Sequence, residues 1–267
     1  MSTVRLERVE GAVALVTLDR PERLNAMSHE LVGDLHDVLD EVRMDTSYRT
    51  VVLTGAGRGF CAGLDLKGAG QAPHTEGLGP TPAGMRSQQH IAALVPKLRG
   101  LPQPVIAAVN GPAAGGGLAL ALASDVRIAA QSARFNVAFV RIGLSGCDIG
   151  VSWLLPRLVG ASRAFELLLT GRIIDSAEAD RIGLVLKVVP DGQVVEAALE
   201  TAALIAANSP FGVWMTKEVM WSNLETPSLH AAIDLENRTQ ILTSTTRDMR
   251  EAMAAFLEKR PADWTYG

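Results

Sequence analysis

Hydrophobic and polar positions along the chain predict short strands in its first half. Residues 4–9 and 12–18 are typical of two strands of a β-hairpin, with Glu10 and Gly11 in its turn. Residues 50–54 and the run that starts at Pro104 are apolar without polar alternation. Such runs indicate strands that are covered on both faces of a sheet.

Helical periodicity appears after Ser28 and dominates from residue 151 onward. Ser28 is expected to cap a helix whose apolar face comprises Leu31, Leu35, Val38, Leu39 and Val42. Further helices are expected at residues 151–158, 162–169, 176–182, 193–208 and 210–222, with extended segments at 125–129, 133–136 and 184–189. Two helices between residues 227 and 259 carry an apolar stripe that includes Leu229, Ile233, Met253, Phe256 and Leu257. The stripe favours packing into the core over an oligomer contact.

Gly115, Gly116 and Gly117 follow the strand that starts at Pro104 and open a helix rich in Ala and Leu. Glycine lets a ligand approach the backbone closely, and the first N–H groups of a helix have no partner within it. With the helix dipole behind them, these donors suit a ligand oxygen that carries negative charge. The alternative is a tight helix–strand crossing that needs small residues for packing alone.

The composition is that of a soluble protein with one domain or slightly more. The chain has 267 residues, of which 48% are hydrophobic and 20% charged. A net charge of −4 gives no reason to expect nucleic acid or an anionic membrane as a partner. No signal peptide or spanning segment is expected, and Cys61 and Cys147 have no metal-ligand spacing. These features predict a cytoplasmic protein without a metal.

A second glycine-rich stretch follows the strand at residues 50–54. Gly55 and Gly57 suggest a dinucleotide-binding loop, but Phe60 occupies the third glycine position, so this motif is excluded. Residues 68–84 are rich in Gly, Pro, Thr and Gln and predict a mobile loop. A loop of this length in a compact domain is typical of a functional lid.

Six stretches of the chain carry motifs of one known family, in the order of that family. They are PERLNA at residues 21–26, RGFCAGLDL at 58–66, residues 110–121, residues 142–160, residues 169–185 and EAMAAFLEKR at 251–260. The chain thus resembles the enoyl-CoA hydratase/isomerase (crotonase) family over nearly its whole length. The resemblance implies an α/β fold, with a ββα spiral core in residues 1–205 that binds acyl-CoA and carries catalysis. It also implies an α-helical oligomerisation region in residues 206–267 and assembly as a homotrimer or a dimer of trimers.

The family resemblance also implies an acyl-CoA thioester as the ligand. Coenzyme A is then part of the substrate, and no separate cofactor is expected. By position, the backbone N–H groups of Leu64 and Gly116 would hold the thioester oxygen and stabilise the enolate that forms during the reaction. The implied substrate-binding residues are Arg23, Leu24, Ala62, Asp65, Leu66, Phe139, Phe256 and Lys259.

These binding positions differ in what the family resemblance implies for them. Those in the two N-terminal motifs would surround the CoA nucleotide and pantetheine, except that Asp65 is expected to order its turn. Phe256 and Lys259 are three residues apart and are expected to share one helix face. In this family that face reaches CoA, in some members across a subunit boundary. The alternative for Lys259 is a solvated surface side chain.

Two residues stand where the family's hydratases have their catalytic glutamates. These are Ala119 and Phe139, and neither side chain can donate or accept a proton. Asp148 is the remaining candidate for proton transfer, because some isomerases of the family use an Asp in this loop. The alternative is that Asp148 caps the helix expected to begin near residue 151.

The missing glutamates favour an isomerase that shifts a proton over a true hydratase. A hydratase that uses other groups is the first alternative. The second is an acyl-CoA-binding homologue without catalysis, which the missing glutamates support and the retained oxyanion positions oppose. Cys147, His74 and His90 are weaker candidates for chemistry, and a buried, inert thiol is the preferred interpretation of Cys147.

Overall fold

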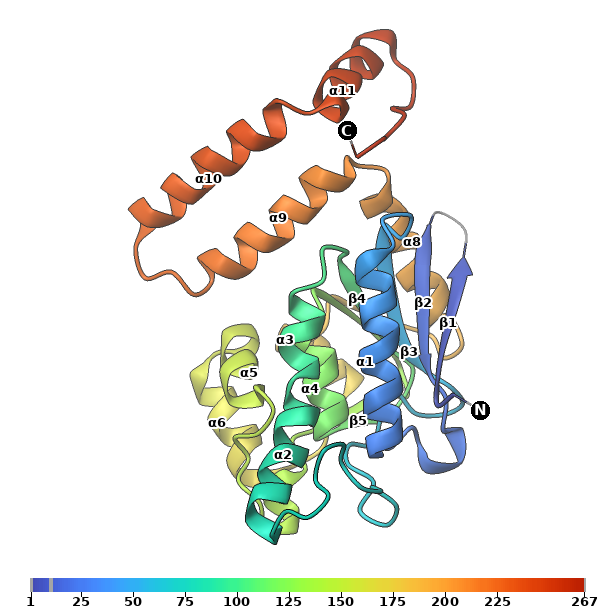
Figure 1. Cartoon of the computed structure of the whole chain (residues 1–267), viewed down its shortest axis with the longest axis vertical. Helices are drawn as coiled ribbons and strands as arrows, with labels where there is room; N and C mark the ends of the chain where they lie inside the picture. Colours follow the sequence, from blue (N-terminus) through green and yellow to red (C-terminus); the bar gives the residue numbers. More distant parts are fainter. Residues whose placement is uncertain (1, 10–11, 267) are drawn as a thin grey trace.

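A six-stranded sheet lies at the centre of the computed structural model, which describes residues 2–9 and 12–266 (Figure 1). Its strands, in spatial order, are β1 (Val4–Val9), β2 (Val13–Leu18), β3 (Thr50–Gly55), β4 (Val105–Val109), β6 (Val126–Ala130) and β9 (Lys187–Val189). β1 and β2 are antiparallel, and all other neighbours are parallel. The two strands of the predicted hairpin are confirmed, whereas its turn at Glu10 and Gly11 lies outside the described residues.

The central strands are covered on both faces, which explains their unbroken apolar runs. On β4, Ile106 and Ala108 belong to a cluster with helix α8 (Val194–Ala206). Val105, Ala107 and Val109 belong to the larger cluster on the opposite face. That cluster contains the buried sides of α1 (His29–Met44), α3 (Leu94–Arg99) and α4 (Gly116–Ala123). The prediction of strands buried on both faces is confirmed.

Two helices at the N-terminal side differ in how well the sequence predicts their start. Helix α1 begins after Ser28, whose Oγ accepts a hydrogen bond from Leu31 N at 3.2 Å, as predicted for the cap. Helix α2 (Pro80–Ala92) begins inside the segment that the sequence predicts to be a loop. Pro80 is well suited to the first helical position, because the N–H that proline lacks has no acceptor there.

A second, three-stranded sheet contains β5 (Ala113–Ala114), β7 (Arg134–Asn136) and β8 (Ile174–Asp175). Only β7 corresponds to a predicted extended segment, because strands of two residues leave no recognisable period in a sequence. A parallel bridge between Cys61 and Ala113 joins residues 58–66 to β5. The small sheet therefore brings two of the family-like stretches into contact.

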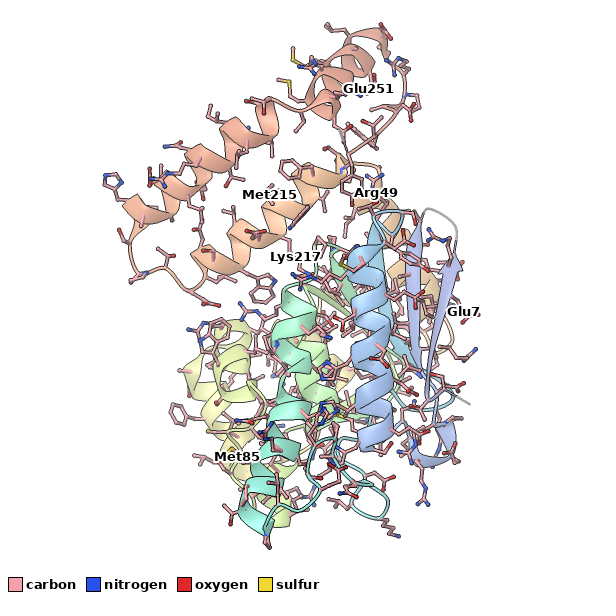
Figure 2. The ribbon with its side chains drawn as sticks, in the orientation of Figure 1. Glu7, Arg49, Met85, Met215, Lys217 and Glu251 are labelled. Atoms are coloured by element: carbon pink, nitrogen blue, oxygen red, sulfur yellow. The ribbon has the colours of Figure 1, made fainter. Side chains whose placement is uncertain are left out.

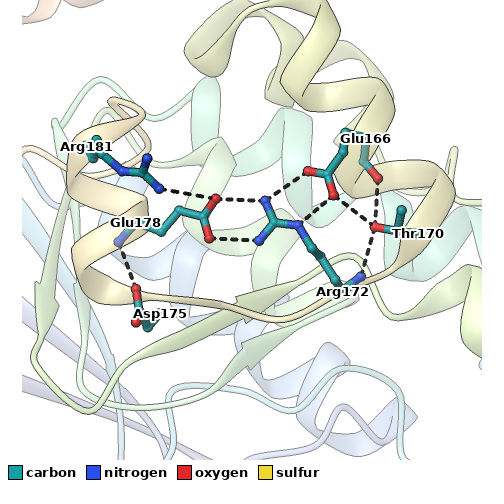
Figure 3. Close-up of polar contacts among 6 residues, drawn as sticks. All are labelled: Glu166, Thr170, Arg172, Asp175, Glu178 and Arg181. Carbon is teal, nitrogen blue, oxygen red and sulfur yellow. Dashed lines mark hydrogen bonds and ion pairs between the residues drawn. The ribbon is translucent and has the colours of Figure 1, made fainter.

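Helices α5 (Val151–Val159), α6 (Ala161–Thr170) and α7 (Ser176–Arg181) complete the body, with the short 3-10 helices η1 (Pro21–Arg23) and η2 (Phe139–Ile142). Arg172 lies between α6 and α7 and binds Glu178 and Glu166, with the closest N–O distances at 2.7 and 2.6 Å (Figure 3). The hydrogen bonds that Arg172 donates to Glu178 and Glu166 raise its pKa above the ordinary value. Partly exposed ion pairs add little stability, so this network mainly fixes α6, which contacts η2, against α7.

Helices α9 (Pro210–Asn223), α10 (Leu229–Ser244) and α11 (Arg247–Glu258) extend away from the sheet, and α10 runs beside α9 (Figure 1). The apolar stripe on α10 and α11 is exposed, with 77% of Leu229 and 83% of Phe256 accessible. The prediction that this stripe packs into the core of the same chain is therefore wrong.

The predicted boundary at residues 205 and 206 falls at the end of α8, and the division into two regions stays a prediction. In the part of the chain that the structure describes, no helix has both the length and the apolar character needed to cross a membrane.

The buried Lys217 of α9 binds the body of the molecule through an ion pair and hydrogen bonds (Figure 2). Lys217 Nζ lies 2.8 Å from Asp125 Oδ2 and donates to the carbonyl oxygens of Leu98 and Gln103 at 3.3 and 2.9 Å. Trp221, one turn further along α9, donates from Nε1 to Asp125 Oδ1 at 2.7 Å. Burial lowers the pKa of Lys217, although Asp125 favours its charged form.

Candidate active site

Two backbone segments meet at the N-terminus of α4: the Leu64 loop (residues 58–66) and the glycine turn (residues 110–117). Ala114 N donates to Cys61 O at 3.0 Å, which holds the two segments together. A Cβ placed on Gly63 would lie 2.8 Å from Ala114 O and 3.4 Å from Gly116 N. The residue that follows Gly63 is Leu64, so the two predicted oxyanion donors come from adjacent stretches of backbone.

Neither of these donors has a partner within the described part of the protein. Gly63 O accepts from Met27 N at 2.7 Å and Asp65 N donates to Met27 O at 3.0 Å, but Leu64 N donates to no described acceptor. Gly116 is the first residue of α4, and its N–H donates to no described acceptor either. Free N–H groups at a helix N-terminus are arranged to bind an oxygen on which negative charge develops.

The three glycines of the turn have separate roles. Gly115 has φ +50°, a left-handed conformation that favours glycine. A Cβ on Gly117 would lie 2.0 Å from the backbone oxygen of Cys61, so the packing interpretation of the turn holds at this position. A Cβ on Gly116 would meet Sδ of Met27 at 2.6 Å. Close packing therefore explains the glycine at position 117, and position 116 supplies the free N–H. Both interpretations of the turn apply, each to its own residue.

Two asparagines shape the Leu64 loop, and the sequence analysis did not assign them a role. Asn25 is fully buried and donates from Nδ2 to the carbonyl oxygens of Ala56 and Gly59 at 2.9 and 2.8 Å. Asn110 donates from Nδ2 to Gly55 O at 2.8 Å and accepts from Gly55 N at 3.2 Å. Their positions in the PERLNA stretch and the glycine turn were visible in the sequence, but the carbonyl oxygens to which they donate lie more than 30 residues away.

Four of the residues expected around coenzyme A are brought together on one rim, built from η1 and the Leu64 loop. Leu24 O accepts from Ala62 N at 3.0 Å, which joins the two segments. The side chains of Arg23 and Leu66 are exposed there. Their binding of coenzyme A stays a prediction.

Asp65 orders the turn in which it lies, as predicted. Its carboxylate accepts from the backbone N–H groups of Lys67 and Gly68 at 3.1 and 2.9 Å, and from Arg20 at 3.0 Å. Burial opposes the charged form, but these hydrogen bonds outweigh it and hold the pKa of Asp65 below its usual value. Arg20 is a further residue that the sequence analysis missed, since 45 positions separate it from Asp65.

Ala119 and Phe139 line the far side of the glycine turn. Ala119 is fully buried, and its N–H donates to Gly115 O at 3.0 Å. The Phe139 ring lies 3.3 Å from the position that a Cβ on Gly115 would occupy. The two residues therefore lie beside the turn and place apolar surface against it. Their match to the glutamate positions of the family's hydratases stays a prediction.

Asp148 lies in a loop (residues 143–150) that contacts the same turn. Its neighbour Ile149 is buried, and Ile149 Cδ1 is 3.4 Å from the position of a Cβ on Gly116. Asp148 Oδ1 accepts hydrogen bonds from Ile149 N, at 2.7 Å, and from Gln88 Nε2 on α2. The N-cap of α5 is Gly150, with no side-chain cap, so the interpretation of Asp148 as the capping residue is wrong.

The two cysteines have opposite environments. Cys61 is buried, and burial raises the pKa of its thiol to about 12, which keeps it protonated and unreactive. Cys147 is exposed beside Asp148, so the prediction of a buried, inert thiol at this position is wrong. The loop from Gly143 turns outward here, which a sequence pattern cannot show.

Histidines gather where α2 meets α1. His29 Nε2 lies 3.0 Å from Ser87 Oγ, and His36 Nε2 lies 3.0 Å from the backbone oxygen of His90. Burial lowers the pKa of His29 and, together with the neighbouring histidines, that of His90. The imidazoles of His29 and His90 are therefore neutral at neutral pH. Together with His36 they act as structural contacts between α1 and α2, while His74 is exposed in the preceding loop.

Phe256 and Lys259 do not join this site within one chain. α11 lies at the opposite end of the molecule from α2 (Figure 1). Lys259 follows the last residue of α11 and has φ +53°, so it does not continue the helix face of Phe256 as predicted. Among residues 2–9 and 12–266, no group of three His, Cys, Asp or Glu side chains could hold a metal ion.

The fold and the order of the motifs define the class of protein to which the chain belongs. The model of the enoyl-CoA hydratase/isomerase family matches residues 8–267, and the chain belongs to this family. It is an enzyme of the hydratase/isomerase family and acts on acyl-CoA.

Individual relatives agree with the family assignment. The chain is 46% identical to a probable enoyl-CoA hydratase of Mycobacterium bovis over 99% of its own length and 93% of that protein. It is 41% identical to the 1,2-epoxyphenylacetyl-CoA isomerase of Escherichia coli over 97% of both chains. The crystal structure of an enoyl-CoA hydratase from Bacillus anthracis superposes with a TM-score of 0.91 at 34% identity, covering 99% of this chain and 100% of that one. The predicted crotonase-like fold is confirmed.

Proposed function

We propose that this enzyme moves a double bond in an enoyl-CoA thioester by shifting a proton from one carbon to another. In a 3-enoyl-CoA, Asp148 removes a proton from the carbon next to the thioester, and the negative charge moves onto the thioester oxygen. The N–H groups of Leu64 and Gly116 stabilise that oxygen. Asp148 returns the proton to the fourth carbon, which leaves the double bond conjugated with the thioester.

The observation that carries this proposal is the set of side chains around the glycine turn. Ala119 and Phe139 flank the turn and cannot transfer a proton, whereas the loop of Asp148 contacts Gly116 through Ile149. Addition of water needs a base that takes a proton from water as the water attacks one carbon. It also needs an acid that gives a proton to the neighbouring carbon. A proton shift needs only one group that takes a proton and then returns it. The carboxylate of Asp148 meets this smaller requirement.

A direct assay of the purified protein tests the proposal. We expect 3-hexenoyl-CoA to be converted to its conjugated isomer, and crotonyl-CoA to be hydrated far more slowly. The conjugated thioester absorbs in the ultraviolet, so one spectrophotometric assay follows its formation and its loss. Hydration of crotonyl-CoA as fast as isomerisation, and retained in Asp148→Ala, would support the hydratase alternative and contradict the proposal.

Calorimetry supplies a second test of the proposed reaction. Binding of acyl-CoA without turnover of either thioester would contradict the proton shift. The proposed proton shift itself requires no cofactor beyond the coenzyme A that the substrate carries.

We place the enzyme in the cytoplasm, since Cys61 and Cys147 are both free thiols and the latter is exposed.

We also propose that the C-terminal helices join copies of this chain into a trimer or a dimer of trimers. Their exposed apolar side chains, among them Leu229 and Phe256, are more than a lone soluble chain usually leaves in water. A cleft of about 950 Å³ between α9, α10 and the body, lined in part by Trp153, Met215 and Trp221, offers further apolar surface. In such an assembly Phe256 and Lys259 could reach the acyl-CoA of a neighbouring copy.

Light scattering on the eluting protein measures this assembly. We expect a mass three or six times that of the 28.3 kDa chain, because the exposed stripe is buried between copies. A monomer at micromolar concentration would contradict the trimer. It would leave Phe256 and Lys259 without a route to the site.

A further inference from the structure

We propose that Gln88 is a positioning residue, which holds the carboxylate of Asp148 so that one particular oxygen transfers the proton. This inference rests on the proposed role of Asp148. Both hydrogen bonds that the carboxylate accepts, from Gln88 Nε2 and Ile149 N, go to Oδ1. Within the described residues, Oδ2 accepts none. Oδ1 is therefore the anchored oxygen and Oδ2 the one left for the substrate.

The loop that carries Asp148 cannot fix this orientation alone. Residues 143–150 form neither a helix nor a strand. Ile149 has φ +35°, an unfavourable conformation for a β-branched residue, and Gly150 has φ +81°. The bond from Ile149 N is local, since donor and acceptor belong to adjacent residues. Gln88 is the described side chain that ties the carboxylate to a different element of the fold, 60 residues away.

Helix α2 is itself held in place by polar contacts next to Gln88. None of its residues is fully buried, and its apolar contact with the core is made by the partly buried Ile91 and Ala92 at its end. Ser87 contacts His29, and the backbone oxygen of His90 contacts His36, so both tie α2 to α1. Gln88 projects from the same turn of α2 toward the Asp148 loop. Helix α2 thus connects Asp148, the proposed proton-transferring residue, to α1, whose apolar face lies in the core.

Substitution of Gln88 by methionine tests this role, because Met has nearly the length of Gln but no donor. We expect Gln88→Met to lower kcat for isomerisation of 3-hexenoyl-CoA roughly 10- to 100-fold with little change in KM, since the carboxylate is misoriented while CoA contacts remain. Gln88→Lys keeps a donor of similar reach and should recover most of the loss. The matched control is Gln89→Met, one residue along the same exposed helix, whose side chain makes no described hydrogen bond; its kcat should equal that of the wild type.

Two further results separate this inference from the proposed function. If Asp148→Asn lowers kcat but Gln88→Met does not, Gln88 is not a positioning residue although Asp148 is catalytic. If the wild type shifts no double bond, the proposed function fails, and crystal structures of the wild type and Gln88→Met still decide the contact. The same Asp148 rotamer in both would overturn the inference. Equal losses in Gln88→Met and Gln89→Met would also overturn it, because they would show a general effect on α2.

Discussion

Asp148→Asn is expected to lower kcat for isomerisation of 3-hexenoyl-CoA by a factor of roughly 10²–10⁴. Asparagine keeps the size of the side chain and the oxygen that accepts from Gln88 and Ile149, so the loop retains its hydrogen bonds. The amide cannot take up the proton from the substrate carbon. Binding of a saturated acyl-CoA, measured by calorimetry, should be unchanged, because the CoA rim and the two backbone donors are left intact.

The exposed thiol beside Asp148 provides the control for this substitution. Cys147→Ala alters the adjacent residue without touching the carboxylate, and its kcat should remain near that of the wild type. A large loss in Cys147→Ala with an active Asp148→Asn would assign the chemistry to the thiol instead. Full activity in both variants would exclude either residue as the proton-transferring group.

Lys217→Met is expected to lower the free energy of unfolding by about 3–5 kcal/mol, because it removes one partner of a buried ion pair. Only 5% of the Lys217 side chain and 18% of that of Asp125 are accessible. Without the ammonium group, the Asp125 carboxylate keeps hydrogen bonds from Val105 N and Trp221 Nε1 but loses the cation of its direct ion pair. The carbonyl oxygens of Leu98 and Gln103 also lose a donor. Unfolding in urea, followed by fluorescence, measures the change.

The same substitution at an ion pair whose carboxylate is exposed provides the comparison. Lys97 lies 2.7 Å from Asp40 and donates to His36 O at 3.1 Å, and 21% of its side chain is accessible against 61% of that of Asp40. Because Lys97→Met leaves the Asp40 carboxylate in water, it should cost no more than about 1 kcal/mol. A loss in Lys217→Met as small as that in Lys97→Met would show that Asp125 is solvated in solution. Adding Asp125→Asn to Lys217→Met should recover part of the stability, since it removes the unpaired charge.

Much of the fold was predictable because it depends on local patterns. The Ser28 cap, the face of α1 and the strands β1 to β4 follow from the spacing of apolar residues over a few positions. The start of α2 and the strands β5 and β8 were not predictable, because a proline-led first turn and two-residue strands carry no period. The Leu64 loop and the glycine turn were located in a different way. Their residues match motifs of the family, and this match does not depend on a hydrophobic period.

The candidate site was predictable in its backbone and not in its side chains. The sequence indicated Leu64 and Gly116 as donors, and the structure places their segments in contact with both N–H groups unpartnered among the described residues. The link from Gln88 to Asp148, and the binding of Asp65 by Arg20, join residues that are 60 and 45 positions apart. No local pattern encodes such pairs.

By itself, the sequence determined the family, the glycine turn and the absence of both glutamates, because each is a matter of which residue occupies which position. Only the tertiary structure decided that Gly117 serves packing while Gly116 keeps a free N–H, and that Asp148 is bound by α2 instead of capping α5. It also decided that the stripe on α10 and α11 is exposed. These properties depend on which surfaces approach one another in space, and an amphipathic pattern specifies that a face will be covered without specifying by what.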